Sequence, residues 1–269
     1  MNNLYISNLC SDKKNFEQLL NIILKYNKAI YGLDIAPLNV TENWHYSETE
    51  SKRIYNLLKN KKLKINAIQG IFYKKNLNLL NDFFTNEKKI IDHIKKIINI
   101  CKIYHCNKII FGSAEFRNKK SNSKKNADYV FTKFIEKIIP LLEENKIIFC
   151  IETIPKIYNS DYLFKFNQTC KIVKFFNNQF VRINFDSGIF FNSRFNINIF
   201  IDNLNLINNV QISEPYNNFF INPKRYNLHF LDTLRKISYE GTVSLEIISR
   251  KFEEEKIEKS INNFINFFN

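Results

Sequence analysis

Four segments in the second half of the chain carry a side chain near their ends that can bind a cation or move a proton. Glu152 stands in the apolar run 147–153, and Asp186 closes the run 180–186. Gln211 lies in the segment 209–213 and Glu246 in 242–248. Side chains alternate along a strand, so each residue shares a face with small or polar neighbours. Those neighbours are Cys150, Arg182, Asn184, Ser213 and Ser244.

The residue types of this set favour a divalent cation. Carboxylates that converge in a medium of low dielectric constant repel one another, and a cation removes that conflict. Two Glu, one Asp and one Gln carbonyl suit Mg²⁺ or Mn²⁺; Zn²⁺ or Co²⁺ is possible but less favoured, because no thiolate or imidazole is supplied. The alternative is four strand-end residues that are independently solvated or that make structural hydrogen bonds. The register of all four favours a metal site formed by Glu152, Asp186, Gln211 and Glu246.

Strand-like and helix-like patterns alternate along the whole chain. The expected strands are 4–7, 30–36, 64–69, 108–112, 147–153, 180–186, 209–213 and 242–248. The expected helices are 15–26, 48–59, 85–104, 124–145, 161–176, 197–203, 226–237 and 253–267. Strict alternation of this kind is typical of parallel βαβ units, and eight units predict a single α/β (β/α)8 TIM barrel over residues 1–269. An open doubly wound sheet is the alternative. The five glycines are expected at strand boundaries.

The composition constrains the partner and the compartment. The formal charge is +14, yet the lysines are spread along the chain together with many Asn and Ile residues, so a nucleic-acid partner is unlikely. Five unpaired cysteines suit a reducing compartment. No stretch has the length of a membrane span or the pattern of a signal peptide. We expect a cytoplasmic protein without a membrane partner, and a homo-oligomer is possible.

Several motifs together resemble the sugar phosphate isomerase/epimerase superfamily, the xylose isomerase-like TIM barrels. They are GLDIAP (32–37), NAIQGIFY (66–73), KIIFGSAEFR (108–117), IETIPKIYN (151–159), INFDSG (183–188), VQISEP (210–215) and GTVSLEI (241–247). In that superfamily Glu, Asp, His or Gln, and Glu from the last four strands hold a metal, which implies the same four ligands here. Many members have His where this chain has Gln211, and Gln is similar to the hydroxypyruvate isomerase branch. Many epimerases also have His where this chain has Ile189.

The resemblance implies an enzyme that isomerises or epimerises a small sugar, sugar phosphate or hydroxy-keto acid. The metal would polarise the carbonyl of the substrate and stabilise an enediolate. Glu152 and Glu246, on opposite sides of the substrate carbon, would take and return the proton as the two catalytic groups. Dehydration of a keto-polyol by the same enolisation is a further possibility.

Other residues near strand ends are candidates for binding the carbohydrate or keto-acid substrate. An aromatic ring gives a sugar an apolar wall, and a basic group holds a phosphate or carboxylate. Arg182, which points inward, is expected to pair with Asp34 or Asp186. The substrate-binding candidates are Trp44, His45, Tyr73, Arg117, Glu214 and Arg225.

Two other functions compete with a sugar isomerase. A metal-dependent endonuclease acting at abasic DNA would use this kind of barrel and the basic charge, but its chemistry resembles a His-rich trinuclear zinc site. This chain has four histidines, none at the strand ends named above. A catalytically inactive barrel that serves as a binding protein is the other alternative, and the presence of both Glu152 and Glu246 argues against it.

Overall fold

Eight parallel strands close into a barrel in the computed structural model, which describes residues 3–44, 47–191 and 195–268. The strand order follows the chain, and the first strand pairs with the last. The strands are β1 (Asn3–Ser7), β2 (Ile30–Ile35), β3 (Lys64–Ile68), β4 (Lys108–Phe111), β5 (Ile148–Glu152), β6 (Val181–Asp186), β7 (Ile207–Ser213) and β8 (Thr242–Glu246). The predicted (β/α)8 barrel is confirmed, and the open sheet is excluded.

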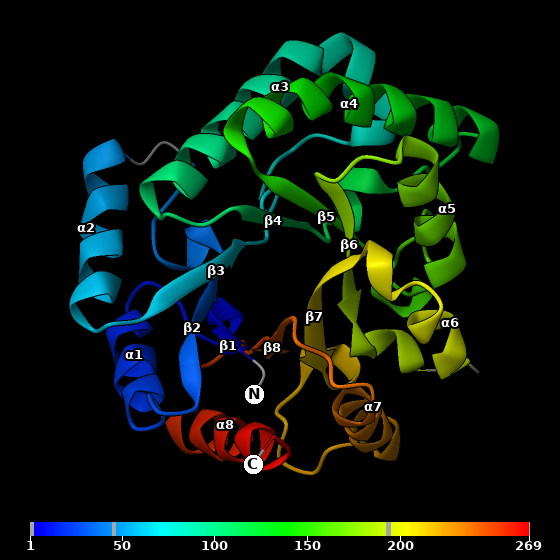
Figure 1. The fold of residues 1–269 in the computed structure, drawn as a ribbon. Coiled ribbons are helices and arrows are strands. Elements are labelled where there is room, and N and C mark those ends of the chain that lie inside the picture. The colour runs from blue at the N-terminus through cyan, green and yellow to red at the C-terminus, as the bar shows by residue number, and fades with distance from the viewer. Residues whose placement is uncertain (1–2, 45–46, 192–194, 269) are drawn as a thin grey trace.

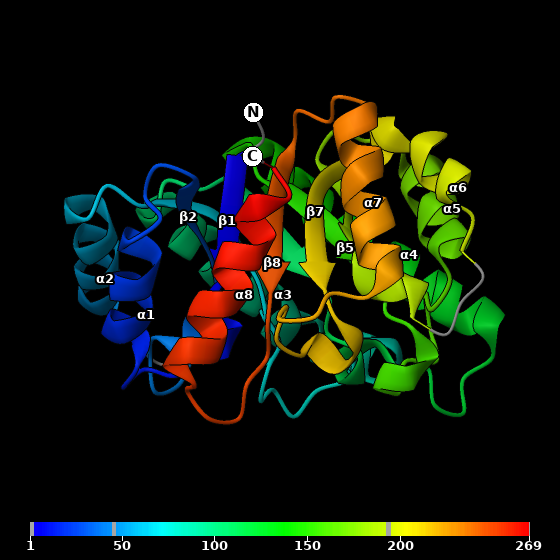
Figure 2. The same ribbon diagram turned by 90° about the horizontal axis from the view of Figure 1, so that it is seen from below.

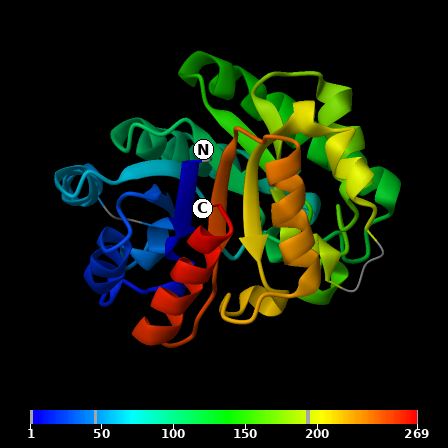
Figure 3. The same ribbon diagram turned by 60° about the horizontal axis from the view of Figure 1, so that its bottom comes forward.

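Helices surround the strands, as Figure 1 shows. They are α1 (Phe16–Leu24), α2 (Glu48–Asn60), α3 (Leu79–Ile103), α4 (Lys124–Asn145), α5 (Phe166–Phe176), α6 (Ile197–Ile201), α7 (Arg225–Lys236) and α8 (Glu254–Asn266). In Figure 2, β1, β7 and β8 run side by side with α7 and α8 outside them. Figure 3 shows α8, in red, outside β1 and β8, and α8 also contacts α1, which completes the ring.

Two helices, α3 and α5, begin five or more residues away from their predicted starts. Helix α3 begins at Leu79, six residues before the predicted start, because the side chain of Asn78 accepts a hydrogen bond from Asn81 N and caps the helix there. The backbone leaves helical geometry at Asn86, next to the predicted helix start at residue 85. Helix α5 begins at Phe166 rather than at 161, because the preceding segment turns at Leu163 with a positive φ of 52°.

Gly32 corrects the expectation that every glycine stands at a strand boundary. It lies inside β2, and a Cβ atom there would come 1.8 Å from the carbonyl oxygen of Lys64 on β3. Only glycine permits this close approach of the two backbones.

The barrel has an apolar outer layer and a largely polar interior. Phe149 and Ile151 of β5 point outward into the hydrophobic core between strands and helices, while Cys150 and Glu152 point inward. Asn184, Asn209 and Gln211 are completely buried inside the barrel, which also contains a small apolar cluster of Ala67, Ile110 and Cys150. Polar side chains in such a place must be hydrogen-bonded to one another. Within the described residues, no helix is long and apolar enough to cross a bilayer.

Candidate active site

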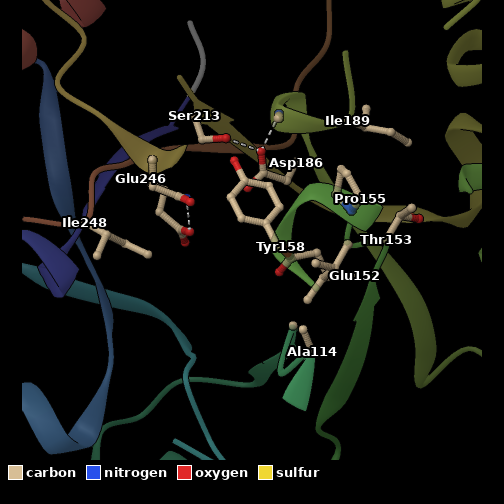
Figure 4. Close-up of a pocket in the computed structure, with 14 residues that line it drawn as sticks. Ala114, Glu152, Thr153, Pro155, Tyr158, Asp186, Ile189, Ser213, Glu246 and Ile248 are labelled. Carbon is tan, nitrogen blue, oxygen red and sulfur yellow. Dashed lines mark hydrogen bonds between the residues drawn. The ribbon is translucent and has the colours of Figure 1, made fainter. Parts of the chain in front are cut away.

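Three carboxylates from three strands line one cavity at the carboxyl-terminal end of the barrel. The cavity has a volume of about 180 Å³ and is lined by Glu152, Asp186 and Glu246, with Tyr158 from the loop after β5 (Figure 4). These residues meet because parallel strands present their carboxyl ends at the same edge of a barrel. The structure therefore brings these three predicted side chains together at one cavity.

Asp186 is held rigidly at the end of β6. Its Oδ1 atom accepts hydrogen bonds from Gly188 N at 2.6 Å and from Ser213 Oγ at 2.5 Å. Burial raises the pKa of Asp186 to about 6, and the two hydrogen bonds act against that rise. A Cβ atom on Gly188 would come 2.8 Å from Ser213 Oγ, so glycine is needed for this arrangement.

Glu152 ends β5 between a glycine and an amide. Its Oε2 atom accepts a hydrogen bond from Asn184 Nδ2 at 3.1 Å, and a Cβ atom on Gly112 would come 2.4 Å from the same oxygen. Burial and, second, the charge of Asp186 raise the pKa of Glu152 to about 8, while Arg117 and Asn184 oppose the rise. Glu152 therefore holds its proton more tightly than an exposed glutamate.

Glu246 ends β8 and accepts one hydrogen bond on each carboxylate oxygen. Gln211 Nε2 donates to Oε2 at 2.9 Å, and Asn217 Nδ2 donates to Oε1 at 2.7 Å. Burial, then the charges of Asp186 and Glu152, raise the pKa of Glu246 well above its usual value. Glu152 and Glu246 are thus two carboxyl groups, each oriented by amide donors, that face the same cavity.

Gln211 lies beneath the cavity rather than in its lining. Its side chain is fully buried, and its Oε1 atom accepts a hydrogen bond from Asn184 Nδ2 at 2.6 Å. Its Nε2 atom donates to Gln69 Oε1 at 2.8 Å as well as to Glu246. The amide therefore connects β6, β8 and the residue that follows β3 below the carboxylates, and its role as a metal ligand stays a prediction.

The carboxylate oxygens that line the cavity are the kind of ligand that a hard divalent cation prefers. In this conformation, however, the side chains are not grouped closely enough to coordinate one ion. Burial raises the pKa of all three carboxyl groups, and the charge of Asp186 adds to the rise at Glu152 and Glu246, a conflict that a cation would relieve. Among the described residues, however, no three His, Cys, Asp or Glu side chains are grouped so that they could hold an ion. Rotation of the glutamate side chains would be required to bring their oxygens onto one cation.

A second, wider cavity opens beside the first and shares Glu152 and Glu246 with it. It has a volume of about 620 Å³ and extends over the ends of β2, β3 and β4. Its lining includes Phe72, Lys75 and Tyr73, whose side chain is 57% exposed. The predicted substrate residue Tyr73 therefore stands at the rim of a space that reaches the two glutamates.

Trp44 and Arg117, two other predicted substrate residues, lie outside both cavities. Trp44 is buried, and its Nε1 donates a hydrogen bond to the carbonyl of Tyr73 at 2.8 Å. It therefore stabilises the loop after β3 that contains Tyr73. Arg117 is fully buried and donates to the backbone carbonyl of Glu152 at 2.5 Å, and burial lowers its pKa to about 10. His45 lies outside the described residues.

The two remaining candidates flank the segment that joins β7 to α7. Glu214 accepts hydrogen bonds from Lys224 N and Asn227 Nδ2, both at 2.9 Å, and so fixes the loop that leads into the helix. Arg225, the first residue of α7, is exposed. Arg182 forms no ion pair with Asp34 or Asp186 in the described part of the chain; it lies opposite Cys150, towards the start of β6.

Sequence reasoning missed the residues that orient the carboxylates. Alternation places Asn184 on the same face of β6 as Asp186, and this spacing is the signal that marks Asn184 as a partner of the site. Asn217 and Tyr158 come from short 3-10 turns after β7 and β5. No periodicity in the sequence marks such positions. Tyr158 lies within the quoted IETIPKIYN motif, yet the motif alone did not show that its ring would enter the cavity.

The family model described as "Xylose isomerase-like TIM barrel" matches residues 29–267, which include every strand but the first. The chain belongs to the xylose isomerase-like TIM barrel family. Within this family's fold, solved structures resemble the chain over nearly its full length. No curated protein matches it in sequence.

Three solved structures illustrate how widely this fold occurs. D-Psicose 3-epimerase from Clostridium cellulolyticum H10, with D-tagatose, has a TM-score of 0.77 and 13% identity and covers 98% of both chains. The 3-keto-D-glucoside 4-epimerase from E. coli has a TM-score of 0.75 and 14% identity, and covers 99% of both chains. A structure named AP endonuclease, family 2, from Brucella melitensis has a TM-score of 0.73 and 16% identity, covering 96% of this chain and 97% of the other. At these identities the likeness concerns the fold.

Proposed function

We propose that this xylose isomerase-like barrel is a divalent-metal-dependent isomerase or epimerase of a small sugar, sugar phosphate or hydroxy-keto acid. The observation that carries the proposal is the single cavity lined by Glu152, Asp186 and Glu246. Two of the structures with this fold are named as sugar epimerases, which supports a carbohydrate substrate.

The two glutamates would act as the acid and base. One carboxylate removes a proton from the carbon next to the substrate carbonyl, and a carboxylic acid returns one. The amide donors on both side chains, Asn184 on Glu152 and Gln211 with Asn217 on Glu246, hold the accepting oxygens in place. Return of the proton to the neighbouring carbon gives isomerisation, and return to the opposite face gives epimerisation.

The cation would be held by Glu152, Asp186 and Glu246, with Gln211 as the predicted fourth ligand. When bound, a divalent ion supplies a Lewis acid that polarises the carbonyl and favours the enediolate. Oxygen donors favour Mg²⁺ or Mn²⁺ over softer ions. Asp186, fixed by Gly188 and Ser213, would be the ligand that moves least.

Metal titration and proton exchange together test the proposal. We expect the purified protein to bind Mn²⁺ and to be stabilised by it against heat, and Glu152→Gln and Glu246→Gln to weaken both effects. In D₂O the wild-type protein should incorporate deuterium into a ketose, its phosphate or hydroxypyruvate, while both variants should not. A protein that neither binds nor is stabilised by any divalent ion would contradict the proposal.

Cleavage of abasic DNA is the competing function. The named endonuclease with the same fold and the charge of +14 favour it. The described histidines do not: His93, His105 and His229 are absent from the lining of both cavities that contain Glu152 and Glu246. Tight, salt-sensitive binding and incision of an abasic duplex, without ketose exchange, would favour the nuclease.

A further inference from the structure

A row of buried amide side chains runs through the barrel from its amino-terminal end to the two glutamates. Asn209 Nδ2 donates to Asn184 Oδ1 at 2.8 Å, and Asn184 Nδ2 donates to Gln211 Oε1 at 2.6 Å. The row ends at two carboxylates, because Asn184 also donates to Glu152 and Gln211 donates to Glu246. All three amide side chains are completely buried, so water does not offer them other partners.

The lower end of the row is fixed by a buried ammonium group. Lys108, on β4, donates from Nζ to Asn209 Oδ1 at 3.3 Å and to Thr242 Oγ1 at 2.8 Å. Thr242 Oγ1 in turn donates to Asn209 Oδ1 at 2.7 Å. An ammonium group has protons and no lone pair, so the atom of Asn209 that faces it must be the oxygen.

A second charged residue, Asp34, acts on the same oxygen of Asn209 through Asn66. Asn66 Nδ2 donates to Asp34 Oδ1 at 2.6 Å and to Asn209 Oδ1 at 3.0 Å. Asn66 Oδ1 accepts from Lys108 Nζ at 3.0 Å. Asn66 thus stands between a group that only donates and a carboxylate that accepts, and a rotation of its amide by 180° would break both bonds.

The position of Asn209 Oδ1 determines the direction of each hydrogen bond between Asn209 and the two glutamates. With its oxygen held, Asn209 presents its N–H to Asn184, and Asn184 must then turn its own N–H towards Glu152 and Gln211. Gln211 in turn presents its N–H to Glu246. If the row ran the other way, amide oxygens would face the carboxylates, which is unfavourable in a buried site.

We propose that Asn209 is a positioning residue, which transmits the hydrogen-bond direction set by Lys108, Thr242 and Asn66 to Asn184 and Gln211 and so orients Glu152 and Glu246. Asn209 touches neither the cavity nor a carboxylate of the site. Its effect on turnover rests on the proposed function, whereas its effect on the amide row does not.

The substitution Asn209→Asp isolates this role, because it replaces the donating NH₂ by an oxygen and keeps the shape. Lys108, Thr242 and Asn66 would still donate to residue 209 and keep the new carboxylate ionised. Asn184 Oδ1 would lose the hydrogen bond that it accepts from residue 209, so the Asn184 amide would rotate. The ammonium group of Lys108 would attract the new carboxylate. Asn107→Asp is the matched control: Asn107 is exposed, precedes Lys108, and adds the same charge at the same end of the barrel.

Side-chain amide NMR of the metal-free protein gives the decisive readout. We expect the NH₂ signals of Asn184 and Gln211 to be protected from solvent exchange in the wild-type protein, to move in Asn209→Asp, and to stay in place in Asn107→Asp. Unprotected signals in the wild-type protein would overturn the proposal without any variant. A folded Asn209→Asp protein with unchanged Asn184 and Gln211 signals would overturn it as well.

Kinetics adds a second readout if the enzyme turns over a ketose. Asn209→Asp should lower kcat about tenfold and leave KM little changed. The expected cause is that the rotated Asn184 no longer donates a hydrogen bond to the carboxylate of Glu152. If no sugar is turned over by the wild-type protein, the proposed function fails, and the amide spectra still decide the role of Asn209.

Discussion

Single residues that carry no charge decide where the carboxylates of this site lie. Gly112 and Gly188 leave room against Glu152 and Asp186, and Asn217 reaches Glu246 from a backbone with a positive φ of 53°. None of them is a candidate for acid–base chemistry. Their substitution therefore tests position separately from chemistry.

Gly112→Ala should displace the carboxylate of Glu152, because the new Cβ would stand 2.4 Å from its Oε2 atom. We expect proton exchange in the substrate to fall about a hundredfold, the effect of a misplacement of about 1 Å. Calorimetry should show weaker Mn²⁺ binding. The double variant Gly112→Ala with Glu152→Asp, whose shorter side chain relieves the clash, should unfold at a higher urea concentration than Gly112→Ala. An unchanged affinity and rate in Gly112→Ala would contradict this role.

Asn217→Gly should reduce kcat about tenfold through the loss of one hydrogen bond to a carboxylate. Glycine accepts the left-handed backbone of this position, so the fold should persist. Asn159→Gly is the control, since Asn159 has a φ of 58° and an exposed side chain outside the cavity. Equal rates in the two variants would show that Asn217 does not orient Glu246.

At the scale of elements, the residue that caps α3 connects this helix to the loop after β4, which lines the wider cavity. Asn78 caps α3 and also donates from Nδ2 to the carbonyls of Glu115 and Asn118, at 3.0 and 2.9 Å. It therefore ties the start of α3 to the loop after β4, of which Glu115 lines that cavity. Ser47, by contrast, caps α2 through one exposed hydrogen bond to Glu50 N.

Asn78→Ala should cost about 2 kcal/mol of unfolding free energy or more, because a cap and two partly buried hydrogen bonds are lost. Ser47→Ala should cost about 1 kcal/mol, the value of a cap alone. Urea unfolding of both variants measures the difference. A smaller loss for Asn78→Ala than for Ser47→Ala would mean that the loop after β4 is held by other contacts.

At the scale of the whole molecule, the barrel depends on one buried histidine that must stay neutral. His93 on α3 packs against Trp44 and Phe72, with ring centroids at 4.6 and 5.1 Å, and its Nε2 donates to the carbonyl of Ile71 at 2.5 Å. Burial lowers the pKa of His93 from 6.5 to about 4. The unfolded chain therefore binds a proton between these two values while the folded protein does not, so stability falls as the pH falls through that window.

The size of this acid-dependent loss can be measured with a neutral replacement. The shift corresponds to about 3 kcal/mol of unfolding free energy lost between pH 6.5 and 4. His93→Gln, which keeps a donor for Ile71, should lose less stability than the wild-type protein between pH 7.5 and 4.5. His229→Gln, at an exposed residue of α7, should behave as the wild type. Parallel urea curves at the two pH values check this, and equal losses in all three proteins would refute it.

The sequence predicted the barrel and three of its carboxylates because both depend on short periods. Alternation along β5, β6 and β8 places Glu152, Asp186 and Glu246 inward at the strand ends, and the βαβ order brings those ends together. It did not predict that Arg117 and Trp44 would be buried behind the cavity, because loop conformations such as the turn at Ala114 are set by tertiary contacts. The direction of the amide row was also inaccessible, since it depends on Lys108 and Asp34, which lie far apart in the chain.

The separation of an apolar outer layer from a polar barrel interior also bears on how such a protein changes over time. Substitutions that alter the amide and carboxylate residues inside the strands leave the packing between strands and helices intact, because the two sets alternate along each strand. A lineage can therefore exchange the hydrogen-bonding pattern beneath its carboxylates, and with it the chemistry they perform, while it keeps the same hydrophobic core. Conversely, a chain whose composition drifts towards asparagine acquires new amide donors and acceptors inside the barrel without having to remodel its exterior.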